Sequence, residues 1–87
     1  LASFDSNMNV ELARLQLAAG DRESAAYSLD KVLKSNADNL PALVLLTELA
    51  IGGSDYVKAE QHARRIIERF PAAGAGLRLL GDIAARR

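Results

Sequence analysis

A period of 34 residues constrains the fold of this chain more than any other feature of its sequence. A shift of one period places residues 6–39 on residues 40–73 with five identical pairs, which are Val10 and Val44, Leu12 and Leu46, Leu15 and Leu49, Asp21 and Asp55, and Ala25 and Ala59. A second shift places Leu43, Leu46, Leu49 and Ala50 on Leu77, Leu80, Ile83 and Ala84. A unit of this length cannot bury its own apolar face, so neighbouring units must stack on each other.

Each 34-residue unit shows the apolar spacing that is typical of helices. Apolar residues recur three and four positions apart, as in Ala25, Leu29 and Val32, and no alternating apolar and polar run predicts a strand. Turn-forming residues separate the helical segments at 19–21, 36–39, 52–55 and 71–74. We therefore expect an all-α fold with helices near 7–19, 22–35, 41–52, 56–69 and 75–86.

Residues at the predicted helix ends and helix contacts fit this arrangement. The carboxylates of Asp21 and Asp55 can accept hydrogen bonds from the first N–H groups of the following helices, a cap worth about 1 kcal/mol each. Pro41 suits a first helical turn, where its missing N–H costs nothing. The small Ala25 and Ala59 should let paired helices approach closely. Four leucines should fill the layer between those helices: Leu12, Leu15, Leu46 and Leu49.

Composition and charge exclude several classes of partner. Eleven basic residues balance eleven acidic ones, which removes the broad positive field expected of a nucleic-acid-binding domain. The longest apolar run, residues 40–50, is far shorter than the roughly 20 residues that cross a bilayer, so we expect no membrane insertion by this segment. Because the chain begins with Leu1 and no leader sequence precedes the fold, we interpret it as a segment of a longer protein.

No group of residues in the sequence predicts catalysis, a cofactor or a bound metal. The chain has no cysteine, and its only histidine, His62, is expected to be a solvated helical residue. The acidic residues lack the spacing of a calcium-binding loop. Gly74, Gly76 and Gly81 match neither a dinucleotide-binding nor a phosphate-binding loop. We therefore expect a protein that is not an enzyme.

Four short motifs point to a known family: Leu80-Gly81, the turn Ser54-Asp55-Tyr56, the contact residues Ala25 and Ala59, and Pro71. With a 34-residue period, these motifs make residues 6–87 resemble the tetratricopeptide repeat family. The sequence departs from the family where a large aromatic residue is usual, since Asn9, Leu43 and Leu77 stand there. The resemblance implies a right-handed superhelical stack of antiparallel helical hairpins, with about two and a half repeats.

We expect a flexible N-terminal lead over residues 1–5, a first repeat over 6–39, a second over 40–73, and the first helix of a third over 74–87. The alternative is a compact five-helix bundle whose period is accidental.

The resemblance also implies a function, because the first helix of each hairpin lines a concave groove that binds a peptide or a partner helix. The groove positions of this sequence are Val10, Arg14 and Leu17 in the first unit, Val44, Glu48 and Ile51 in the second, and Arg78 and Asp82 in the third. Val10 and Val44 stand where a clamp for a C-terminal carboxylate needs polar donors, so an apolar or helical ligand is expected. Alternatively, the apolar positions pack against a neighbouring repeat.

A structural role is the alternative function, in which the segment is a spacer in a longer solenoid and binds no ligand. Leu77, Leu80 and Ile83 are then expected to form an apolar face without a covering helix, through which a homodimer can form.

The segments 41–43 and 77–82 look like bacterial members of the family, including repeat lipoproteins associated with envelope sorting and exopolysaccharide production. Composition does not distinguish the cytoplasm from the bacterial periplasm.

Overall fold

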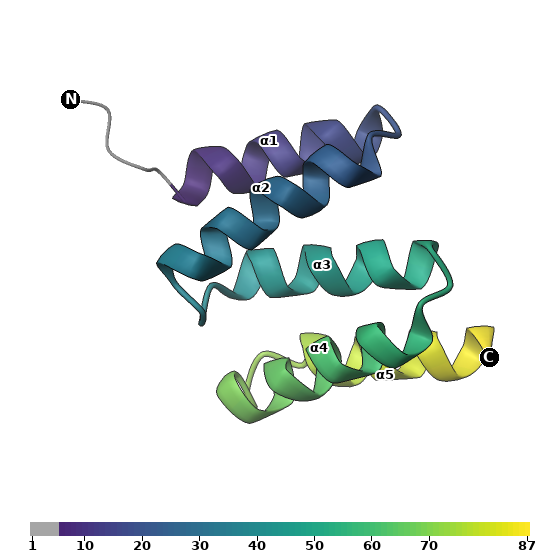
Figure 1. Ribbon diagram of the computed structural model, residues 1–87. Helices are drawn as coiled ribbons and strands as arrows, with labels where there is room; N and C mark the ends of the chain where they lie inside the picture. Colours follow the sequence, from purple (N-terminus) through teal and green to yellow (C-terminus); the bar gives the residue numbers. More distant parts are fainter. Residues whose placement is uncertain (1–5) are drawn as a thin grey trace.

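The computed structural model describes residues 6–87, which form five helices and no strand (Figure 1). The helices are α1 (Ser6–Ala18), α2 (Arg22–Ser35), α3 (Leu40–Gly52), α4 (Tyr56–Arg69) and α5 (Ala75–Arg86). The all-α prediction is confirmed, and each predicted helix end lies within one residue of the observed end. The predicted N-terminal lead, residues 1–5, lies outside the described residues.

The helix boundaries repeat with the period of the sequence. Helix α1 covers 6–18 and α3 covers 40–52, while α2 covers 22–35 and α4 covers 56–69, so both ends of each helix recur 34 residues later. Helix α5 ends at 86, where the same shift of α3 would end it. An accidental similarity in a helical bundle does not explain this agreement, and the period is therefore a repeat of structure.

Side-chain caps fix where three of the helices begin. Asp21 and Asp55 each accept a hydrogen bond at 3.2 Å from the backbone N–H three residues further along, as predicted. Asn39 caps α3 in the same way at 3.0 Å, a cap that the sequence analysis did not identify. Pro41 lies in the first turn of α3, as expected.

The turns that precede α2 and α4 each contain a left-handed residue at an equivalent position. Gly20 has φ of 83° and Ser54 has φ of 61°. Glycine enters this region at little steric cost, whereas a residue with a Cβ is strained there. The second turn therefore keeps the geometry of the first at a cost in conformational energy.

Consecutive helices pack as antiparallel neighbours, and the odd-numbered helices also contact each other. Helix α1 contacts α3 and α3 contacts α5, whereas the backbones of α2 and α4 do not come close to each other. In Figure 1, α1 and α2 form one hairpin, α3 lies beside it, and α4 and α5 follow on the other side of α3. Helices α1, α3 and α5 thus share one side of the stack, which we call the inner side, and α2 and α4 lie on the outer side. The stack measures 44 × 29 × 16 Å.

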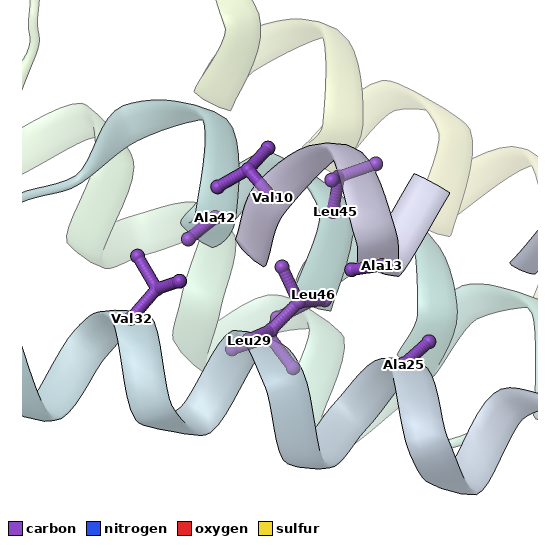
Figure 2. Close-up of a cluster of buried hydrophobic side chains, with 8 residues drawn as sticks. All are labelled: Val10, Ala13, Ala25, Leu29, Val32, Ala42, Leu45 and Leu46. Atoms are coloured by element: carbon purple, nitrogen blue, oxygen red, sulfur yellow. The ribbon is translucent and has the colours of Figure 1, made fainter. Parts of the chain in front are cut away.

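Two clusters of apolar side chains hold the stack together. The first joins α1, α2 and α3 and is drawn in Figure 2; it contains Val10, Ala13, Ala25, Leu29, Val32, Ala42, Leu45 and Leu46. The second joins α3, α4 and α5; it contains Leu43, Ile51, Ala59, Ala63, Ile66, Leu79 and Ile83. Ala25 and Ala59 are fully buried, as predicted for close helix contacts. Leu33 packs against both clusters and links them.

The prediction that Leu12 and Leu15 fill the layer between paired helices is wrong, since they are 45% and 69% exposed. The equivalent Leu46 and Leu49 do pack against the first cluster. Leu46 and Leu49 meet the preceding hairpin, whereas no helix within residues 6–87 covers the corresponding side of α1. The core side of α1 is instead formed by Val10 and by the fully buried Ala13.

Candidate functional site

The predicted groove residues occupy equivalent positions on the three helices of the inner side. Val10, Val44 and Arg78 are related by one period, and Arg14, Glu48 and Asp82 form a second such row. Because α3 contacts both α1 and α5, the rows run across the stack from one helix to the next.

The apolar members of this set are largely covered. Val10 and Ile51 are only 4% and 6% exposed and belong to the first and second core clusters. Leu17 and Val44 are half-buried and pack against those clusters. Only parts of Leu17 and Val44 are therefore exposed on this side, and they do not form a wide apolar strip. Contact of any of these four residues with a ligand stays a prediction.

The charged members of this set are exposed and form only weak ion pairs. Arg14 is 3.4 Å from Glu11 and Arg78 is 3.7 Å from Asp82, in each case within one helix. Exposed pairs of this kind contribute about 0.5 kcal/mol or less, so a partner can displace them at little cost. Within residues 6–87, Glu48 makes no ion pair.

Part of the predicted set lines one hollow between α3 and α5. Its volume is about 190 Å³, and its walls are Glu48, Ile51, Gly52, Asp82 and Arg86. Two carboxylates and one guanidinium therefore surround the hollow, with Ile51 as an apolar wall. The predicted residues on α1 line no part of it.

A network of charges ties the end of α5 to α4. Glu60 accepts a hydrogen bond from Arg64 at 3.0 Å, and its other oxygen lies 3.2 Å from the guanidinium of Arg87. The hydrogen bond and charge of Arg64 lower the pKa of Glu60, and Arg87 lowers it further. These contacts hold the C-terminal end of α5 beside α4.

His62 is less solvated than the sequence predicts. It is half-buried on α4, and burial lowers its pKa, with the charges of Lys58 and Arg65 acting in the same direction. Asp30 and Asp55 oppose this shift. The sequence did not indicate this environment, because it depends on how closely α2 and α4 approach across α3.

Within residues 6–87, no three His, Cys, Asp or Glu side chains come together as a metal site. None of the helices described for this chain is both long and apolar enough to cross a membrane.

Comparison with known families gives a match over most of the chain. The sequence profile of a family described as Tetratricopeptide repeat matches residues 16–83, from the last turn of α1 through most of α5. Comparisons with curated proteins and with solved structures give no significant match. The family match covers the whole second cluster, the members of the first cluster from Ala25 onward, and both negatively charged residues of the 190 Å³ hollow, Glu48 and Asp82.

Proposed function

Because this chain belongs to the tetratricopeptide repeat family, we propose that it is a scaffold that binds a peptide or a partner helix along the face of α1, α3 and α5. The family is generally one of protein–protein interaction modules and is typically not enzymatic. What we propose beyond this general role is the surface of this chain to which a partner binds.

The hollow between α3 and α5 is the observation that carries the proposal. It combines the exposed carboxylates of Glu48 and Asp82 and the guanidinium of Arg86 with an apolar wall at Ile51. Interfaces of this kind use a few apolar anchors and a polar rim that sets orientation.

The charges along the face indicate the orientation of a ligand. Glu48 on α3 and Asp82 on α5 line the hollow together with Arg86 and give it a net charge of −1, while Arg14 lies on α1. A ligand segment with a basic residue near the hollow and an acidic residue near α1 complements this arrangement. We expect a short amphipathic helix or an extended peptide with two to three apolar residues between these charges.

The experiment starts from peptides selected against the chain from a random library, followed by NMR with ¹⁵N-labelled protein. We expect saturable shifts of backbone amides in α3 and α5, and weaker binding by the double variant Glu48→Lys and Asp82→Lys. Glu68→Lys is a matched control, since Glu68 is exposed on α4 and belongs to the opposite side of the stack. Shifts confined to α2 and α4 would contradict the proposal.

A spacer or self-associating segment is the second candidate. Leu77 is 67% exposed on α5 and Leu80 beside it is half-buried, so an apolar strip lies open to a second copy. Ile83, expected on this strip, is instead 2% exposed in the second core cluster, because its side of α5 packs on α3 and α4.

Light scattering after size-exclusion chromatography distinguishes the two candidates. A dimer that Leu77→Asp converts into folded monomers favours the spacer, whereas a monomer unaffected by Leu77→Asp leaves the inner face as the functional surface.

Two narrower predictions remain proposals. They are the repeat limits 6–39, 40–73 and 74–87, and an origin among bacterial envelope members of the family.

A further inference from the structure

The outer side of the stack has a hollow of its own, between α2 and α4. Its volume is about 260 Å³, and it is lined by Ala26, Asp30, Leu46, Leu49, Ala50, Gly53, Asp55, Lys58 and His62. Because the backbones of α2 and α4 stay apart, the C-terminal half of α3 forms the floor of the hollow. Leu46, Leu49 and Ala50 make this floor apolar.

The rim of this hollow carries unused negative charge. The carboxylate of Asp30 is exposed, and no side-chain hydrogen bond or ion pair joins it to another residue in 6–87. Asp55 on the opposite rim uses one carboxylate oxygen to cap α4, and its second oxygen remains available. Lys58 is the positive residue of the lining, so the lining residues carry a net charge of −1 while His62 is neutral.

The chain itself holds a guanidinium group beside this hollow. Arg22 at the start of α2 donates a hydrogen bond to the carbonyl oxygen of Leu49, one of the last carbonyl groups of α3. The guanidinium lies so close to Gly52 and Gly53 that a Cβ on either residue would be 3.0 Å from it. The C-terminal end of a helix carries partial negative charge, which favours a cation there.

We propose that the outer hollow is a second docking site, which accepts one arginine or lysine side chain from a partner protein. The aliphatic stem lies on Leu46, Leu49 and Ala50, and the cationic head lies between Asp30 and Asp55. The volume suits a single long side chain, since pockets for whole small ligands measure about 300 to 1,000 Å³. Long basic side chains bury their stems and keep their charged heads near water, which this combination of floor and rim allows.

His62 forms one wall of the site and makes occupancy depend on pH. Its imidazole faces Asp30 from α2, Asp55 from the α3–α4 turn, and Lys58 and Arg65 from α4. Burial and the two basic neighbours lower its pKa, so the ring is neutral at pH 7. Protonation in mild acid adds a positive charge beside the bound cation and should weaken binding.

The test uses two blocked tripeptides, acetyl-Ala-Arg-Ala-amide and the same peptide with neutral citrulline in place of arginine. In NMR titrations of the intact chain, we expect the arginine peptide to shift the amides of Ala50, Gly53 and His62 saturably. The citrulline peptide should bind several-fold more weakly. Since one exposed charge pair is worth about 0.5 to 1 kcal/mol, Asp30→Asn should weaken arginine-peptide binding about two- to fivefold.

Glu68→Gln is the matched control, because it removes one exposed carboxylate of α4 that lines neither hollow and should leave tripeptide binding unchanged. Binding by the native chain should fall as the pH drops below the unshifted histidine pKa of about 6.5, and His62→Gln should remove most of that fall. The inference is wrong if citrulline binds as well as arginine, if Asp30→Asn has no effect, or if no saturable shift occurs at tens of millimolar peptide. It is independent of peptide binding on the inner face, which the pair Glu48→Lys and Asp82→Lys tests.

Discussion

We expect Gly76 and Gly81, both in α5, to respond in opposite ways to replacement by alanine. Gly76 is buried where α5 crosses α4, and a Cβ there would lie 2.5 Å from Cγ1 of Ile67 and 3.0 Å from the backbone oxygen of Ala63. At Gly81, no atom would lie within 4 Å of an added Cβ. The two substitutions are chemically identical and differ in the surroundings of the new methyl group.

The expected magnitudes follow from these surroundings. In an exposed helix interior, alanine is favoured over glycine by about 1 kcal/mol, so Gly81→Ala should raise the free energy of unfolding by roughly that amount. At Gly76 the same gain is opposed by overpacking, which costs about 1 to 3 kcal/mol in a packed interior. Both Ile67 and the α4 backbone would have to move, so we expect Gly76→Ala to lower stability by about 1 kcal/mol net.

Urea denaturation followed by circular dichroism measures both variants against the parent chain. In a domain of this size, about 1 kcal/mol corresponds to roughly 4 to 8 °C in Tm, so thermal melts provide an independent reading. The variant Ile67→Ala removes the closest atom, and Gly76→Ala should cost less in that background than alone. If Gly76→Ala stabilises the chain as much as Gly81→Ala does, or if no coupling to Ile67 is found, the argument from close packing fails.

Three further predictions concern the turns, a helix end and His62. Ser54→Gly should relieve the left-handed strain and raise the free energy of unfolding by about 1 kcal/mol, while the reciprocal Gly20→Ser should lower it similarly. Equal and small effects in urea melts would argue against strain. Arg22→Ala should lower stability by about 1 kcal/mol, because it leaves the α3 carbonyl of Leu49 without this donor. Arg14→Ala, which removes an exposed pair, should cost less than about 0.5 kcal/mol in the same assay. Because the pKa of His62 is lowered in the folded chain, its unfolded state binds more protons, so stability should fall as pH drops below the unfolded pKa of about 6.5. Melts at several pH values should show a smaller loss for His62→Gln, and an identical pH profile would refute this reading.

The features that the sequence predicted correctly depend on local chemistry. Asp21 and Asp55 cap the helices that follow them, because an N-cap involves only the residue and the N–H groups of the next turn. The helix limits follow from the same signals together with the 34-residue period. The buried Ala25 and Ala59 were predicted because a small residue recurring on a helix indicates a close contact.

The features that the sequence did not predict depend on which side of a helix is covered. Leu12 and Ala13 are adjacent, and periodicity alone does not say that the larger residue is exposed and the smaller one buried. The half-burial of His62 and the outer hollow arise where α2 and α4 flank α3, a geometry set by helix packing. Glu48 and Asp82 line the inner hollow together. The 34-residue period predicted that they occupy equivalent positions on neighbouring helices, but it did not predict how far apart they lie.

The position of α3 has a consequence for cooperative unfolding. It is the helix, among those of residues 6–87, that contacts all four others, whereas the backbones of α1 and α2 do not come close to those of α4 or α5. The two ends of the chain are therefore thermodynamically coupled mainly through α3, with smaller contributions from Leu33 and from the ion pair of Arg69 with Asp38. Amide hydrogens in α3 should exchange most slowly with solvent, and α1 and α5 should open in separate subglobal events that leave the middle of the chain folded.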